Sequence, residues 1–162
     1  MALFVGEFEQ QVDAKHRLAI PFALRELIDA EQDGERFYLV LSSERHLLLY
    51  PSKYYRRLVD VLDRSPLPAP ESEAAGMDLL WGIARMVKPD KQGRIVLPEK
   101  SLERAELTHK VTLVGEMDRV HIWPRDAWNA HVEKGLPSYG KMLREAAARL
   151  RRQKAPASET DG

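Results

Sequence analysis

The sequence predicts an α+β fold, mainly β, made of two tandem copies of one small module. A short segment occurs twice, as DAKHRLAIP at residues 13–21 and as DKQGRIVLP at residues 90–98. Each copy has Asp, then Arg four residues later, then three apolar residues and Pro, and the second copy follows the first by 77 residues (90 − 13). The same order of expected elements surrounds both copies, so we interpret them as internal repeats.

The first copy predicts two strands around a polar corner, followed by a short helix. Loosely alternating apolar residues over 3–12 are typical of a half-exposed strand, and the apolar run 18–20 predicts the next strand. Pro21 suits the first turn of a helix, because the backbone N–H that proline lacks would stay unpaired there. An apolar stripe supports this helix, formed by Leu24, Leu27 and Ile28.

A hairpin closes each copy. The polar segment 29–35 is expected to be a loop, and the apolar runs 37–41 and 47–50 predict a hairpin whose strands are buried on both faces. The second copy repeats this plan with strands over 81–87 and 95–97, a Pro-led helix over 99–107, and a hairpin over 111–114 and 120–123 whose turn contains Gly115 and Asp118.

The predicted organisation has five parts. They are a first module at 1–60, a Pro-rich linker and connecting helix at 61–77, a second module at 78–135, a basic helix at 136–154 and a disordered tail at 155–162. Each module is small enough that stacking or oligomerisation is expected, since about 60 residues bury only about 60% of their extended-chain surface.

The composition excludes several classes of protein. The 25 basic residues balance the 25 acidic ones, so any surface for nucleic acid must come from local charge. The absence of cysteine excludes disulfides and zinc ribbons and fits a reducing cytoplasm. The N-terminus lacks a basic, apolar leader, and no apolar run approaches the length of a membrane span, so we expect a soluble, cytoplasmic protein with no membrane partner.

The duplicated corner, DAKHR…P and DKQGR…P, resembles the paired D-x-x-x-R motif of the MraZ transcriptional regulators, which carry two SpoVT-AbrB-like modules. The resemblance covers about residues 3–150 and includes the aromatic–Pro pair after each hairpin. It implies two tandem swapped-hairpin β-barrel modules in each chain and a closed ring of chains. It also implies a nucleoid-associated repressor that binds short direct repeats of double-stranded DNA upstream of a cell-division and cell-wall gene cluster. The chain departs from the family at His16, where Gly is common and a positive φ is expected.

The corner chemistry can be interpreted from the residues alone. An Arg four residues after an Asp, across a chain reversal, forms a local ion pair, while the Asp also accepts backbone N–H groups of the turn. A guanidinium held in this way suits guanine O6 and N7 or a phosphate. Arg17 and Arg94 are therefore either turn staples or DNA contacts, and the resemblance favours DNA contacts. Asp13 and Asp90 are expected to structure the corners, since a carboxylate repels phosphate.

Three further residues belong to the corners. Lys15 and Lys91 flank them at non-equivalent positions and are expected to contact phosphates, which conveys no sequence information; without the resemblance they would be solvated lysines. Gly93 is expected to let the second corner turn.

Other candidate sites are weaker. The five histidines show no metal-ligand spacing, so no metal is expected, and His121 lies in an alternating strand where it is expected to face solvent. The larger aromatic residues are expected in the core or at an interface. The basic face of the C-terminal helix is interpreted as solvated, as a non-specific DNA contact or as a surface that packs on a neighbouring subunit.

Three classes of function remain open. The first is a sequence-specific DNA-binding regulator that acts as a homo-oligomer, with no cofactor and no small-molecule substrate. The second is an antitoxin-like protein-interaction module with incidental DNA binding. An enzyme is disfavoured, because the sequence contains no recognisable nucleophile–base pair, Walker loop or dinucleotide-binding motif.

Overall fold

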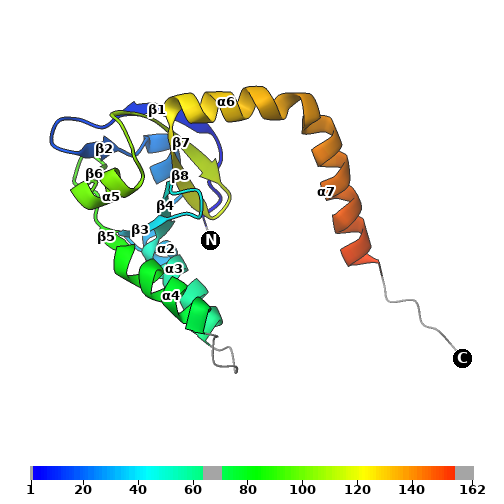
Figure 1. Ribbon diagram of the computed structural model, residues 1–162, viewed down its shortest axis with the longest axis horizontal. Helices are drawn as coiled ribbons and strands as arrows, with labels where there is room; N and C mark the ends of the chain where they lie inside the picture. Colours follow the sequence, from blue (N-terminus) through cyan, green and yellow to red (C-terminus); the bar gives the residue numbers. More distant parts are fainter. Residues whose placement is uncertain (1, 64–70, 156–162) are drawn as a thin grey trace, which may run out of the picture. The chain divides into compact units, whose positions relative to one another are not determined.

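The computed structural model describes residues 2–63 and 71–155, so residues 156–162 of the expected tail and residues 64–70 of the expected linker lie outside the described residues. The strands are β1 (Glu7–Gln11), β2 (Arg17–Ala19), β3 (Phe37–Leu41), β4 (Leu47–Pro51), β5 (Arg85–Val87), β6 (Arg94–Val96), β7 (Lys110–Glu116) and β8 (Arg119–Pro124). The helices are α1 (Phe22–Arg25), α2 (Ala30–Asp33), α3 (Ser52–Asp63), α4 (Glu71–Ile83), α5 (Glu99–Arg104), α6 (Arg125–Gly135), the 3-10 helix η1 (Leu136–Ser138) and α7 (Tyr139–Lys154) (Figure 1).

The strands of the two repeats interleave in one six-stranded antiparallel sheet of order β1-β7-β8-β4-β3-β5. Each edge strand comes from the opposite repeat to its neighbour, since β1 pairs with β7 and β5 pairs with β3. The predicted α+β, mainly β class is confirmed. The described strands form this open sheet and a separate two-stranded ribbon, β2–β6, rather than the closed barrels that the resemblance implies.

The register of the sheet preserves the internal repeat. Leu48 faces His121 across β4 and β8, and these two residues are counterparts in the aligned hairpins. The ribbon shows the same relation, because Leu18 of β2 faces Ile95 of β6, 77 residues later. Counterpart strands therefore meet antiparallel, as a local two-fold relation between the repeats requires.

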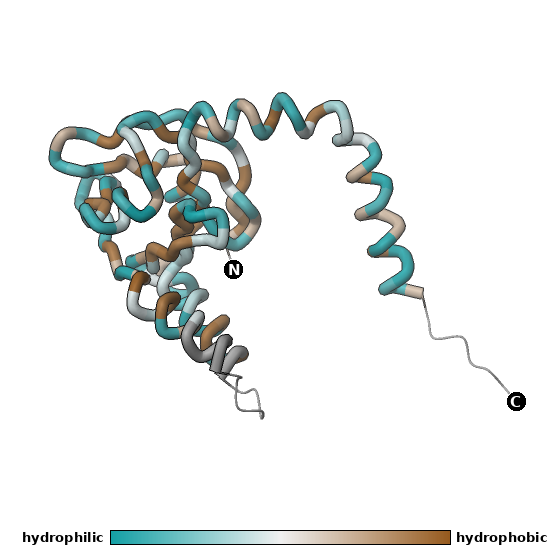
Figure 2. Tube along the Cα trace, in the orientation of Figure 1, coloured by the Kyte–Doolittle hydropathy of each residue, from teal (hydrophilic) through white to brown (hydrophobic). Residues whose placement is uncertain are grey.

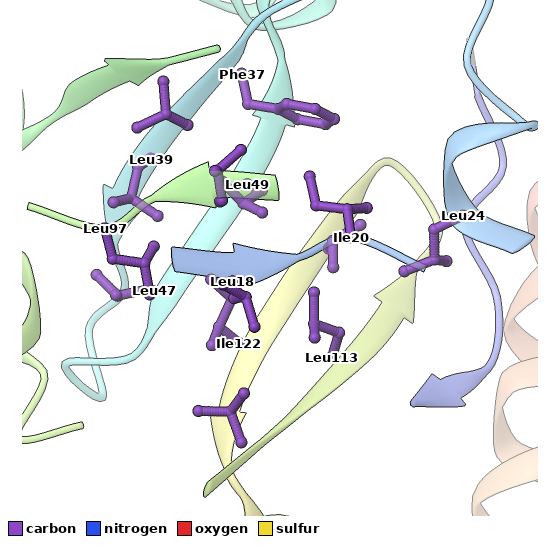
Figure 3. Close-up of a cluster of buried hydrophobic side chains, with 14 of the residues drawn as sticks. Leu18, Ile20, Leu24, Phe37, Leu39, Leu47, Leu49, Leu97, Leu113 and Ile122 are labelled. Atoms are coloured by element: carbon purple, nitrogen blue, oxygen red, sulfur yellow. The ribbon is translucent and has the colours of Figure 1, made fainter. Parts of the chain in front are cut away.

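The main core lies between the ribbon and one face of the sheet. Leu18 and Ile95 are both 0% exposed, and Figure 3 shows Leu18 and Ile20 among side chains of the large sheet. The sheet contributes further large buried groups to this cluster, among them Leu39, Leu47, Leu49, Leu113 and Ile122. Burial of this apolar surface is the main favourable term that holds the ribbon in place.

A second cluster lies on the opposite face of the sheet. Val40, Leu48 and Tyr50 point to this face and pack against Tyr55 and other residues of α3, with Leu80 of α4 alongside. Figure 1 shows α3 and α4 below the strands of the first hairpin. The period-two alternation along β4 thus places successive residues in two different cores, which explains why the whole strand is buried.

Three local predictions are wrong. Residues 29–35 contain α2, because the Asp29 carboxylate accepts hydrogen bonds from the N–H groups of Glu31 and Gln32 and caps a helical turn. The expected strand over 81–87 is shorter, since α4 continues to Ile83. Gly115 lies in β7 rather than in the turn, and it is required there because the backbone of Phe4 and Val5 crosses where a Cβ would stand.

The chain divides into two compact units, Met1–Arg125 and Asp126–Gly162. In the second unit α7 ends at the predicted residue 154, but it begins at Tyr139 because η1 occupies residues 136–138. Figure 2 shows hydrophilic and apolar residues alternating along α7. Its apolar stripe is exposed, with Met142 at 48%, Leu143 at 52% and Leu150 at 58%. No helix within residues 2–63 and 71–155 is long and apolar enough to cross a bilayer.

Candidate nucleic-acid interface

The first corner is a turn built on the side chain of Asp13. Its Oδ1 atom accepts hydrogen bonds from the backbone N–H groups of Lys15, at 2.9 Å, and Arg17, at 2.8 Å. Its Oδ2 atom accepts the Nε–H of Arg17 at 2.7 Å. The backbone closes the turn, since the N–H of Asp13 donates to the carbonyl of Arg17 at 3.0 Å. The carboxylate therefore organises both the turn and the guanidinium.

The second corner has the same bonds at the counterpart positions. Asp90 Oδ1 accepts the backbone N–H groups of Gln92 and Arg94, both at 2.9 Å, and its Oδ2 atom accepts the Nε–H of Arg94 at 2.9 Å. The N–H of Asp90 donates to the carbonyl of Arg94 at 2.8 Å. Both ion pairs that the Asp–Arg spacing predicts are thus present, in matching settings.

The hydrogen bonds of the corners hold both carboxyl groups ionised. The bond from the Arg17 backbone N–H is the largest influence and lowers the pKa of Asp13 below its ordinary value, against a smaller opposing effect of desolvation. The Arg94 backbone N–H lowers the pKa of Asp90 in the same way. Both Asp–Arg pairs are therefore charged at neutral pH.

The ribbon brings Arg17 and Arg94 to one face. Because Leu18 and Ile95 point into the core, the residues before and after them point to the opposite, partly exposed face. On this face Arg17 pairs with Val96 and Ala19 pairs with Arg94. The two arginines are therefore diagonal neighbours across the ribbon, with their backbones about 7–8 Å apart. Within the described residues their Nη atoms make no hydrogen bond, so each guanidinium keeps its outer edge free for a ligand.

The remaining residues predicted for the corners lie on the turns. Lys15 and Lys91 are both exposed. His16 and Gly93 occupy counterpart positions with φ of 60° and 77°, so the backbone that favours Gly is present in both corners. His16 is half-buried and Gly93 is buried, so the two corners have different surroundings.

His121 is buried at 6% exposure, so its predicted solvent-facing position is wrong. It lies opposite Leu48, on the same face of the sheet as the second cluster, where the sequence pattern indicated solvent. Its Nδ1 atom lies 2.8 Å from a carboxylate oxygen of Glu116, its Nε2 atom lies 2.9 Å from Nδ1 of His46, and its ring stacks on Trp123. No three His, Asp or Glu residues of the described chain are placed to hold a metal ion. Sequence reasoning missed this cluster: Glu116, His121 and Trp123 are close in the chain, but His46 comes from the other repeat, 75 residues before His121.

Both corners lie within the part of the chain that matches a known protein family. The family model described as MraZ protein, with the further words antitoxin-like, matches residues 3–78 and 80–150, which include both corners. The chain belongs to the MraZ family. The resemblance noted from the duplicated D-x-x-x-R motif is thereby confirmed.

Curated MraZ relatives carry the name Transcriptional regulator MraZ. The protein of Heliobacterium modesticaldum is 34% identical over 137 residues, which are 85% of this chain and 92% of the relative. The protein of Desulfitobacterium hafniense is 33% identical over the same shares of the two chains, and that of Clostridium tetani is 30% identical over 83% of this chain and 90% of the relative. These MraZ relatives support a role in transcription regulation.

Proposed function

We propose that the chain binds double-stranded DNA in a sequence-specific manner through its two corners and regulates transcription. The observation that carries this proposal is the shared face of the ribbon, on which Arg17 and Arg94 lie as diagonal neighbours with free outer edges. A two-stranded ribbon fits the major groove of B-DNA, where guanidinium groups bind guanine O6 and N7. A backbone separation of about 7–8 Å corresponds to about two base steps.

The other residues of the face support this orientation. Val96 lies opposite Arg17 and two residues after Arg94, and its side chain is 58% exposed. This apolar side chain is suited to contact the methyl group of thymine. Lys15 and Lys91 extend from the turns towards the flanking phosphates, which positions the ribbon without specifying sequence. Both carboxylate oxygens of Asp13 and of Asp90 accept hydrogen bonds from the arginine of the same corner. We therefore assign to these aspartates the role of positioning the guanidinium groups.

The proposal extends to assembly and regulation. One chain offers few phosphate contacts and no net positive charge, so we infer that a closed ring of chains binds short direct repeats. Linking weak sites raises apparent affinity by about 10² to 10⁴. We further propose that the protein acts as a repressor upstream of a cell-division and cell-wall gene cluster, in the cytoplasm at the nucleoid, without enzymatic activity, cofactor or small-molecule substrate.

A mobility-shift assay tests the function directly. The purified chain is titrated into the DNA upstream of its own gene and into a shuffled DNA of the same length and composition, at one fixed salt concentration. We expect the upstream DNA to bind at least about 10³-fold more tightly. Equal affinity for the two DNAs would contradict sequence-specific binding. Light scattering on the same sample tests the ring, which a monomer at micromolar concentration would contradict.

The family description carries the words antitoxin-like, which favours a protein-interaction module as the second candidate. In that case DNA binding is incidental, and sequence preference depends on a second protein. The two candidates differ in one measurement. The purified chain alone discriminates upstream from shuffled DNA if it is a regulator in its own right, and shows no preference if its main role is to bind a partner.

A further inference from the structure

The two corners match in their backbone but differ in what packs on them. Gly93 is buried because the side chain of Arg25 lies over it: a Cβ at position 93 would stand 2.5 Å from both Cζ and Nε of that guanidinium. His16, the counterpart of Gly93, is half-buried and carries a full imidazole. A side chain as large as His would clash with Arg25 in this position, so the two corners have different surroundings.

Arg25 is fixed in this position by its own contacts. Its Nε–H donates to the carbonyl of Ile20 at 2.9 Å, and the N–H of Ile20 donates to the carbonyl of Gly93 at 2.9 Å. Its Cζ atom lies 5.6 Å from the centre of the Phe22 ring, which is 66% exposed. These contacts join α1 of the first repeat to the corner of the second repeat.

The charge of Arg25 has no acidic partner among the residues that the structure describes. The other two guanidinium groups of this face are each paired with an aspartate, whereas Arg25 forms no ion pair there and no hydrogen bond through its Nη atoms. A cation that is held in place, left without a carboxylate and set beside a DNA-contacting corner is suited to a phosphate.

Among the described residues, no counterpart of Arg25 packs on the first corner. The N–H of Leu97 donates to the carbonyl of His16 at 2.8 Å, which is the counterpart of the bond between Ile20 and Gly93. The residue 77 positions after Arg25 is Leu102, and the residue 77 positions after Phe22 is Glu99. Where the second corner has a guanidinium, the first therefore has a neutral residue, and where the second has an aromatic ring, the first has a carboxylate.

We propose that Arg25 is a phosphate-contacting residue that acts with Arg94, so that the second corner binds DNA more tightly than the first. This inference rests on the proposed DNA-binding function. Each chain then has two unequal DNA-binding sites. The second corner contributes three basic residues, Arg25, Lys91 and Arg94, and the first corner contributes two, Lys15 and Arg17.

The test measures affinity for upstream and shuffled DNA over a range of salt concentrations. Arg25→Met removes the charge and retains an unbranched side chain, while Arg25→Lys keeps the charge without the Nε bond. Arg56→Gln, which removes an exposed charge on α3, is the matched control. We expect Arg25→Met to lower the affinity for both DNAs equally, by about fivefold to tenfold at 0.1 M salt. The slope of log affinity against log salt concentration should become shallower by about 0.9. Arg25→Lys and Arg56→Gln are expected to keep the slope of the parent.

A double-mutant cycle locates the contact. The effect of Arg25→Met should be unchanged in an Arg17→Ala background and smaller in an Arg94→Ala background, since only neighbours are coupled. A parent-like salt slope in Arg25→Met, with a lower melting temperature, would overturn the proposal and make Arg25 a structural staple. Equal coupling to both arginines would overturn its assignment to the second corner. A parent protein that binds neither DNA would overturn the proposed function, and with it this inference.

Discussion

Leu18 and Ile95 lie directly opposite each other across the β2–β6 ribbon, although 77 residues separate them in the chain. Both side chains are 0% exposed. Their burial fixes which way the ribbon faces, because a slip of one residue would send Arg17 and Arg94 into the core. The packing of two counterpart residues thus places two counterpart arginines on one outer face.

Asp13→Ala should lower both DNA affinity and melting temperature. The carboxylate accepts three hydrogen bonds within the corner, so its removal loosens the turn as well as the guanidinium. Arg17→Ala is the matched variant, which should lower DNA affinity and leave the melting temperature close to that of the parent. Thermal unfolding and titration with upstream DNA measure the two effects. Equal melting temperatures for Asp13→Ala and the parent would contradict the structural role of Asp13.

Acid should weaken the corners. The pKa of Asp13 is lower in the folded chain than its ordinary value, chiefly through the Arg17 backbone N–H, so its contribution to stability is present above about pH 4 and is lost as pH falls further. The slope of stability against pH below about pH 4 should therefore be smaller in Asp13→Asn than in the parent, as measured by urea unfolding at a series of pH values. An unchanged slope would argue against this linkage.

Tyr54→Phe should destabilise the second face of the sheet. The Tyr54 hydroxyl of α3 donates to Asp118 Oδ2 at 2.7 Å, and Asp118 is 8% exposed in the turn between β7 and β8. Burial, with this hydrogen bond as the second cause, raises the pKa of Tyr54 to about 12, so the hydroxyl keeps its proton at neutral pH. Loss of the donor should lower the free energy of unfolding by about 1–3 kcal/mol. Urea unfolding at one protein concentration checks this, with the exposed Tyr139→Phe as a control that should match the parent.

His46 should make stability depend on pH near neutrality. Burial is the main cause that lowers the pKa of His46, and the neighbouring His121 ring adds to it. The unfolded chain takes up this proton near pH 6.5 and the folded chain only at lower pH, so stability should fall as pH drops below about 6.5. His46→Gln should flatten this fall, while His109→Gln, at an exposed position, should keep the slope of the parent. Identical slopes for His46→Gln and the parent would contradict this role.

Much of the fold could be predicted from local sequence. The corners, both hairpins and the presence of α7 depend on neighbouring residues, so their patterns were sufficient. The exchange of edge strands between repeats depends on contacts between distant segments, and no local pattern predicts that β1 pairs with β7. The burial of His121 was missed for a related reason, since an alternating strand with one polar residue looks half-exposed until the side chains that pack on it, such as His46 of the other repeat, are known.

The candidate site also combines local features that the sequence predicts with contacts between distant segments that it does not. The Asp–Arg pairs are local, four residues apart, and the repeat itself pointed to both of them. The shared face of Arg17 and Arg94 needs the pairing of β2 with β6, which the sequence did not reveal. Arg25 was missed because it reaches a corner that lies in the other repeat.

Removal of residues 139–162 should separate specific from non-specific affinity. The helix α7 carries Arg151, Arg152 and Lys154 in its last turn, which we expect to contact phosphates. Its loss should therefore weaken binding to upstream and shuffled DNA by the same factor. The salt slope should fall by about 0.9 for each phosphate contact removed. Light scattering must show the parent assembly in the truncated chain, because the exposed apolar stripe of α7 is also suited to a subunit contact. A selective loss of upstream binding with assembly intact would contradict this division of roles.

The most direct test of the central claim is the ratio of affinities for upstream and shuffled DNA in Arg17→Ala and Arg94→Ala. If the guanidinium groups read base edges, each substitution should cost about 1–3 kcal/mol on the upstream DNA and lower the ratio accordingly. Binding to shuffled DNA should weaken much less. Variants that bind both DNAs more weakly but keep the ratio of the parent would reduce Arg17 and Arg94 to turn staples or phosphate contacts, and would contradict sequence recognition by the two corners.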